Sequence, residues 1–289
     1  MAKAMAVDPR YYQITVLGSL LIYGVLALDF EVTWSYVSII LTSVLGTQWL
    51  CSWMTKTVFE WRSAMISGLS LCLLCRTQSW QLAALAGVLA IATKFVFRRG
   101  GKHSFNPTNI ALVLLMLVTE GRVWVSPGQW GNVAFFAFLM ACLGGLVVMR
   151  AARADVALAF LTSWIILIMG RSLWLHEPMT IPLHRLQNGA LLLFTFFMIS
   201  DPRTTPDSRA GRIVFAMLVA WCGWWWQFRM FGTNGLLWSL AACSVLTPFI
   251  DWLLPGPRYD WRQGIKSHPD HHEKIPAPSA GGAEPALPC

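Results

Sequence analysis

Polar side chains with ligand-binding chemistry lie at two breaks between apolar stretches of this sequence. Asn106-Pro107 opens one apolar run, and Asp201-Pro202 follows the end of another at Ile199. Proline disfavours a helix at the residue before it and is itself favoured at a helix start. Asn106 can therefore cap free backbone amides, and those amides could also face an anionic ligand. Asp201 is likewise either a helix stop or a contact to a cofactor or ion. We predict a polar cytoplasmic site made from both breaks: Asn106, Asn109, Asp201, Thr204 and Thr205.

A second polar group, Gln187-Asn188-Gly189, precedes a short apolar run. The run from Ala190 to Ile199 holds ten residues. At about 1.5 Å per residue a helix of this length cannot cross a hydrocarbon core of about 30 Å. Part of its backbone must then be buried in protein or line a polar cavity, and short glycine-marked spans are where membrane proteins place ligand sites.

Two further features have both a structural and a functional interpretation. Lys94 stands inside an apolar run, near its end. Its side chain either snorkels to the membrane interface or directs its charge at a phosphate or a cavity. Cys72 and Cys75 have C-x-x-C spacing without a second pair, so they are either ordinary buried cysteines or a thiol or metal pair shared across a subunit interface. We predict no metal site.

The elements that position these residues must be membrane helices. Hydrophobic residues make up 56% of the 289 residues and charged residues only 12%, whereas soluble domains average about 25% charged. Mean hydropathy is +0.54. The net charge of +8 comes from dispersed basic residues, which form no run typical of nucleic-acid binding. The lipid bilayer is the expected surrounding, and nucleic acid is not an expected partner.

Apolar runs between charged residues predict an all-α, polytopic protein with about ten helices. Sixteen basic residues fall in the predicted inner segments and five in the outer loops. By the positive-inside rule this predicts a multi-pass protein of the cell inner (plasma) membrane with both termini cytoplasmic. The expected helices are 12–28, 34–53, 63–75, 80–97, 108–119, 131–149, 155–170, 188–200, 213–228 and 235–254.

Paired landmarks suggest a duplication. Ser67-Gly68 and Asn188-Gly189 are 121 residues apart, and the Thr-Asn step at Thr108 recurs at Thr233, 125 residues later. A repeated unit of five helices must be inverted in the membrane. We therefore expect two inverted five-helix repeats within a transmembrane domain at 11–254, about 11–120 and 131–254. A cytoplasmic N-terminus at 1–10 and a disordered cytoplasmic tail at 255–289 complete the expected domains.

Three segments carry a resemblance to a known family. The segment NGALLLFTFFMISDPRTTP resembles part of the NqrB/RnfD family, the large membrane subunits of the sodium-pumping NADH:quinone reductase and of the Rnf complex. The segments 94–109 and 233–251 are similar to two further motifs of that family. The longer segment 185–212 looks closer still to a divergent branch labelled as the enediyne biosynthesis protein UnbU.

The resemblance implies flavin-linked membrane electron transport, coupled in the family to movement of Na⁺ or H⁺. In the family a threonine carries covalently attached FMN, and the equivalent residue here is Leu191, which has no hydroxyl. FMN or riboflavin would then be held non-covalently. Expected partners are other membrane redox subunits. The candidate cofactor-binding residues are Gln187, Asn188, Gly189, Asp201, Thr204, Thr205, Asn106, Asn109 and Lys94.

Two other classes of function stay open at this point. The chain could be an inverted-repeat transporter of a small molecule or an ion, or a non-redox membrane scaffold of a biosynthetic complex. The sequence contains no hydrolytic triad, Walker loop or GxGxxG fingerprint, so no self-contained catalytic site is expected. If a flavin is bound, the chain would be part of an ion-translocating oxidoreductase.

Overall fold

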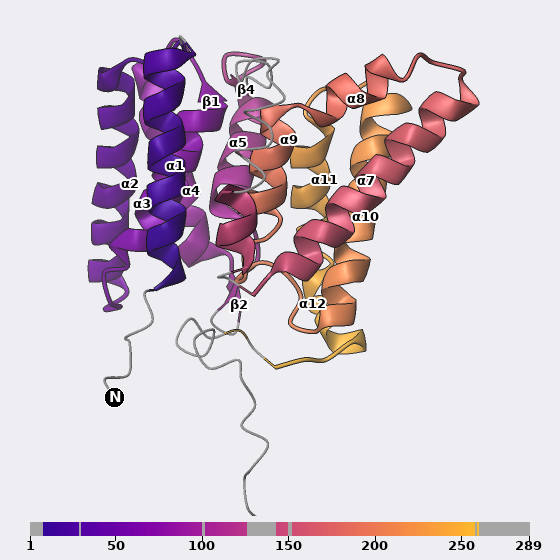
Figure 1. Ribbon diagram of the computed structural model, residues 1–289. Helices are drawn as coiled ribbons and strands as arrows, with labels where there is room; N and C mark the ends of the chain where they lie inside the picture. Colours follow the sequence, from indigo (N-terminus) through magenta and orange to yellow (C-terminus); the bar gives the residue numbers. More distant parts are fainter. Residues whose placement is uncertain are drawn as a thin grey trace, which may run out of the picture.

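The computed structural model describes residues 8–28, 30–99, 102–125, 143–149, 152–257 and 259, and these residues are mainly helical. The first half of the chain forms one helical group (Figure 1). Local capping starts several of its helices, because Asp8, Thr33, Ser79 and Asn106 each accept a backbone N–H of the first turn. The helices are α1 (Pro9–Ala27), α2 (Trp34–Met54), α3 (Trp61–Leu74), α4 (Trp80–Val96) and α5 (Pro107–Val118).

The second half of the chain forms a second helical group beside the first (Figure 1). Residues 143–149 are helical and precede it. Its elements are α7 (Ala154–Trp174), α8 (Thr180–Leu186), α9 (Gly189–Leu193), the π-helix η1 (Phe194–Met198), α10 (Arg209–Phe228), α11 (Gly235–Ser244) and α12 (Thr247–Leu253).

The predicted helices have counterparts within a few residues wherever the structure describes them, with three differences. The loop expected after α7 contains the short helix α8. The helix expected at 235–254 is broken into α11 and α12, which bend by 53°. Two antiparallel pairs of two-residue strands, β1 (Cys75–Arg76) with β4 (Trp124–Val125) and β2 (Arg98–Arg99) with β3 (Lys102–His103), interrupt the purely helical pattern. Most of the helix expected at 131–149 lies outside the described residues.

The two groups have matching packing partners. In the first, α2 packs on α4 and α4 on α5; in the second, α7 packs on α10 and α10 on α11. Helices α5 and α11 meet between the groups. Close approach of α10 and α11 depends on glycine, because a Cβ added at Gly235 would lie 2.7 Å from the carbonyl oxygen of Gly223.

Span lengths vary widely. Among the described residues, α2 and α7 are each long and apolar enough to cross a membrane, and α11 with α12 passes the same test as a bent pair. Helices α3, α4, α5 and the α9–η1 pair are apolar but shorter. The expectation of ten spans therefore stays a prediction.

The segment expected to be enclosed by protein is enclosed. Every residue from 191 to 200 is buried, and this stretch includes all of η1. A π-helix is rare and is most often found as a single turn at functional sites. The short run between Asn188 and Asp201 thus lies in the interior, between the two groups of helices (Figure 1).

Candidate functional site

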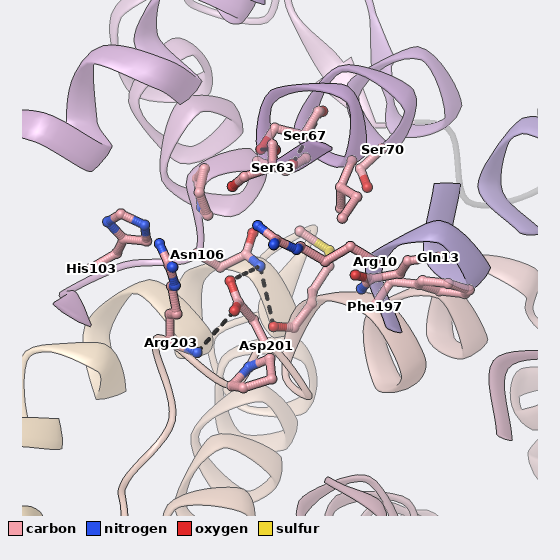
Figure 2. Close-up of a pocket in the computed structure, with 15 residues that line it drawn as sticks. Arg10, Gln13, Ser63, Ser67, Ser70, His103, Asn106, Phe197, Asp201 and Arg203 are labelled. Atoms are coloured by element: carbon pink, nitrogen blue, oxygen red, sulfur yellow. Dashed lines mark hydrogen bonds between the residues drawn. The ribbon is translucent and has the colours of Figure 1, made fainter. Parts of the chain in front are cut away.

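Asn106 and Asp201 bring the two helix breaks together. The Asn106 side chain accepts the backbone N–H of Asn109 at 3.0 Å and so caps α5. Its Nδ2 donates to the carbonyl oxygen of Met198 at 3.3 Å and faces Asp201 Oδ2 at 3.5 Å. Figure 2 shows both contacts at the centre of the inner polar cluster. One buried amide therefore caps its own helix and contacts the end of the other break.

The other residues predicted for this site lie close by but are largely occupied by structural bonds. The hydroxyls of Thr204 and Thr205 donate to the backbone carbonyl of Asp201 at 3.3 and 3.1 Å. Asn109 Nδ2 donates to the carbonyl of Leu237 on α11 at 3.1 Å. Its Oδ1 is buried without a hydrogen-bond partner among the described residues. The structure brings the predicted residues together, and their role in ligand binding stays a prediction.

Burial sets the charge state of this cluster. Desolvation raises the pKa of Asp201, although the backbone N–H and the charge of Arg203 and the charge of Lys94 oppose that rise. Desolvation also lowers the pKa of His103 to about 3, and the nearby Lys94 charge lowers it further. His103 is therefore neutral at physiological pH. Its Nδ1 donates to the carbonyl oxygen of Lys94, 3.2 Å away.

The cavity enclosed by the inner polar cluster is small. Its volume is about 50 Å³, and Asn106, Asp201, Arg203 and Arg10 are among its lining residues (Figure 2). Such a space holds one or two water molecules and is far below the size of a cofactor pocket. The inner cluster is therefore too small to hold a flavin.

A much larger cavity lies beside Leu191. Its volume is about 540 Å³, within the usual range of ligand pockets. Asn188, Ala190 and Leu191 line it, whereas Gln187 and Gly189 do not. Asn188 caps α9 by accepting the backbone N–H of Ala190 at 2.9 Å. Sequence reasoning missed the lining residues from the loop between α10 and α11, among them Thr233 and Asn234.

The π-helix η1 separates the two cavities. Phe194 and Met198 line the large cavity, while Phe197 and Met198 line the small one. Met198 therefore contacts both spaces. The wall between the large apolar-lined cavity and the inner polar cluster is a single layer of buried side chains.

Lys94 does not snorkel. Its side chain is buried, with 4% of the residue exposed, and Nζ donates to the Ser63 carbonyl at 3.1 Å and to Ser63 Oγ at 3.0 Å. The interfacial alternative from the sequence is therefore wrong. Lys94 lines a third cavity of about 240 Å³, together with His103 and Arg203.

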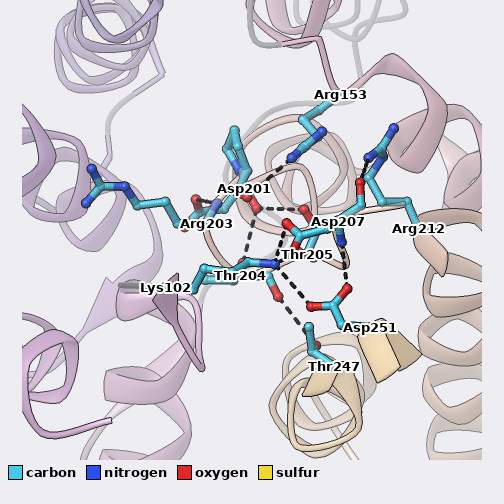
Figure 3. A network of polar contacts seen from close by, with 11 residues as sticks. Lys102, Arg153, Asp201, Arg203, Thr204, Thr205, Asp207, Arg212, Thr247 and Asp251 are labelled. Atoms are coloured by element: carbon cyan, nitrogen blue, oxygen red, sulfur yellow. Dashed lines mark hydrogen bonds and ion pairs between the residues drawn. The ribbon is translucent and has the colours of Figure 1, made fainter. Parts of the chain in front are cut away.

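A network of charges that the sequence did not predict lies beside the second break. Lys102 Nζ donates to Asp207 Oδ1 at 2.8 Å and contacts Asp251 Oδ2 at 3.2 Å (Figure 3). Asp251 Oδ1 in turn accepts the backbone N–H of Asp207 at 2.7 Å. Arg212 pairs with Asp155 in the same region. No local pattern could have revealed this network, because the paired residues are more than 40 positions apart in the chain.

The C-x-x-C pair takes the structural alternative. Cys72 and Cys75 are both fully buried at the end of α3, and the described residues contain no group of three metal-ligating side chains. The backbone carbonyl of Cys75 accepts the Tyr36 hydroxyl at 3.0 Å.

The comparison with known families bears on the half of the chain that holds the large cavity. Residues 123–259 match the NQR2, RnfD, RnfE family. This segment belongs to that family. It contains Asn188, Leu191 and Asp201, so the resemblance to NqrB/RnfD is confirmed, while the UnbU branch stays a prediction.

Curated relatives agree with the family. The RnfD-type protein of the ion-translocating oxidoreductase complex from Escherichia coli (strain K12) is 29% identical over 151 residues, which are 51% of this chain and 40% of the relative. Its counterpart from Shigella boydii serotype 18 is 30% identical over 153 residues, with the same coverage. The matched region thus spans less than half the length of these relatives. The chain is a helical membrane protein of the RnfD/NqrB type.

Proposed function

We propose that this chain is the membrane subunit of an RnfD-like electron-transport complex and binds a flavin non-covalently. The observation that carries the proposal is the cavity of about 540 Å³ beside Leu191. It lies at the position where the family resemblance implies a flavin. The relatives are named as subunits of an ion-translocating oxidoreductase complex, and we extend that type of role to this chain.

The lining of the cavity suits a flavin. Trp124, Trp164 and Phe194 supply aromatic surface, and aromatic side chains stack well on flat ligands. Polar groups for the ring edge and the phosphate come from Arg185, Asn188, Gln227, Thr233 and Asn234. A mainly apolar pocket with a few polar groups is the usual composition of a cofactor site.

The bond to the protein cannot be the family's phosphoester. Leu191 has no oxygen, and it is 4% exposed at the wall of the cavity. The nearest candidate hydroxyl, on Thr195, is fully buried and donates to the carbonyl of Leu191 at 2.7 Å. A bound flavin would accept and pass on electrons, and this chain's residues would orient it and exclude water.

The inverted repeat and the ten spans belong to the same proposal. Their support is a pair of reciprocal contacts between α5 and α11. Asn109, from the first Thr-Asn step, donates to Leu237 on α11 at 3.1 Å, and Asn234, from the second step, donates to Met116 Sδ on α5 at 3.4 Å. Such exchange is expected of two equivalent helices related by a pseudo-two-fold axis. Both termini would then lie in the cytoplasm.

The proposed partners are lipid and other membrane redox subunits. Large apolar side chains are exposed on several helices, including Trp53 on α2, Leu158 on α7 and Trp221 on α10. In water such surface is unfavourable, whereas in a bilayer or a subunit interface it is covered. Enzymatic activity would belong to the assembled complex.

An absorption spectrum of the purified protein tests the proposal, and two matched variants locate the site. Arg185 lines the cavity and lies 4.9 Å from the Phe228 ring. Arg229 lies 5.9 Å from the Trp225 ring and does not line it. Arg185→Gln should weaken FMN binding by roughly 10- to 100-fold, as expected for loss of a charged hydrogen bond, and should leave riboflavin less affected. Arg229→Gln should bind FMN as the wild type does.

The alternative functions predict other results. A transporter or a scaffold would show no flavin absorption and no retention of added FMN. Solute or ion flux into proteoliposomes would then identify a transporter, and absence of flux would favour a scaffold.

A further inference from the structure

A third cavity, distinct from the proposed flavin cavity, lies between the inner ends of the first helical group and the loop after η1. Its volume is about 240 Å³. Three cationic side chains line it, and the only carboxylate among its described lining residues is that of Glu60. The residues that carry the argument are Glu60, Ser63, Lys94, Arg98, His103 and Arg203.

Lys94 provides a buried charge without a counter-ion. The residue is 4% exposed, and its ammonium group has only Ser63 Oγ and the Ser63 carbonyl as hydrogen-bond acceptors among the described residues. No carboxylate forms an ion pair with it in the same part of the chain. Removing an ammonium ion from water is costly unless an opposite charge compensates it.

The two arginines at this cavity are similarly uncompensated. Neither Arg98 nor Arg203 forms an ion pair in the part of the chain that the structure describes. Asp201 accepts only the backbone N–H of Arg203, at 3.1 Å. Figure 2 shows the Arg203 side chain extending toward His103 instead.

The remaining titratable groups do not cancel this positive charge. Glu60 is ion-paired with Arg10 and is partly exposed. His103 donates from Nδ1 to the Lys94 carbonyl, and its ring is neutral. The cavity therefore has three cations, and its one described carboxylate is already paired.

We propose that this cavity binds an anion carrying a phosphate group. Lys94 would contribute a point charge from the closed end, and Arg98 and Arg203 would contribute guanidinium donors, the preferred partners of phosphate oxygens. At about 240 Å³ the space is below the range of drug-sized pockets. It accommodates a phosphate or a headgroup rather than a dinucleotide.

The phosphate group can come from solution or from an anionic lipid. Both sources share the same chemistry at Lys94 and Arg203. A soluble anion would bind in detergent without lipid, whereas a lipid headgroup would require its bilayer. The experiment separates these two sources.

The full-length protein in detergent is titrated with inorganic phosphate at constant ionic strength, with chloride as the reference anion, and thermal stability and calorimetric binding are measured. In parallel, the protein is reconstituted into neutral phosphatidylcholine vesicles with and without phosphatidylglycerol. Arg203→Gln and Lys94→Met are compared with Arg209→Gln, which removes an exposed charge from the start of α10 outside this cavity.

Saturable stabilisation by phosphate supports a soluble ligand, and stabilisation only by phosphatidylglycerol supports a lipid headgroup. In either case Arg203→Gln should weaken the effect roughly 10- to 100-fold, and Arg209→Gln should not. Lys94→Met should act in the same direction; if that variant does not fold, Arg203→Gln decides. The proposal is overturned if neither source stabilises the wild type, or if Arg209→Gln loses as much binding as Arg203→Gln. Flavin content is unaffected by either result, so this test is independent of the proposed function.

Discussion

Lys102 Nζ lies 2.8 Å from Asp207 Oδ1, and this ion pair joins the loop between α4 and α5 to the loop between η1 and α10. The same ammonium contacts Asp251 at 3.2 Å, so three segments of the chain meet at one side chain (Figure 3). Asp207 and Lys102 are only 10% and 21% exposed at their side chains. The contact therefore holds the two helical groups together beside the inner polar cluster.

Replacing Lys102 by Met should destabilise the protein. The change leaves the partly buried carboxylates of Asp207 and Asp251 facing each other without a cation. We expect a loss of about 1–3 kcal/mol, the usual effect of losing hydrogen bonds to charged groups. Thermal unfolding in detergent measures it. Lys56→Met, at an exposed lysine without an ion pair among the described residues, is the control, and an equal change in both variants would contradict the role of Lys102.

Asn106→Ala should cost more than the loss of a helix cap. The side chain caps α5 through Asn109, and it also donates to the carbonyl of Met198. A cap is worth about 1 kcal/mol and each buried hydrogen bond about 1 kcal/mol more, so we expect about 2–3 kcal/mol. Thr33→Ala is the comparison, because the exposed Thr33 only caps α2, through Tyr36 at 3.2 Å. Equal losses in the two variants would show that the contact across the breaks contributes nothing.

No flavin should remain on the denatured polypeptide. Leu191 cannot form a phosphoester, and the hydroxyl of Thr195 is buried against the carbonyl of Leu191. In-gel fluorescence after denaturation should therefore be absent, whatever the spectrum of the native protein shows. A fluorescent band that Thr195→Ala abolishes would move the attachment to Thr195. A band that persists in that variant would mean that the motif is wrongly aligned on Leu191.

The topology predicts opposite locations for two reporter fusions. A fusion at Cys289 should report the cytoplasm, and a fusion after Trp174 should report the opposite side. Trp174 ends α7 and is 81% exposed, and Figure 1 shows α7 ending on the side opposite to the start of α1. If both fusions report the same side, the ten spans and the inverted repeat are both wrong.

Much of the helical pattern was predictable because its signals are local. Long apolar runs with few charges specify membrane helices, and Asn106-Pro107 set the start of α5 where the structure has it. The shortness of the run after Asn188 correctly indicated a buried segment. The same residues also carried the family resemblance that the match of residues 123–259 confirms.

Tertiary structure decided what those helices enclose. The sequence placed Lys94 near a helix end, but only the packing of α3 on α4 shows that its ammonium reaches Ser63 instead of the membrane interface. Helix α8 and the 53° bend between α11 and α12 were not predicted, because short helices and bends depend on the neighbours that cover them. The cavity beside Leu191 brings together α7, α9, η1 and the loop before α11. A cavity is the space that distant elements leave between them, so no local run of residues can specify its size or its lining.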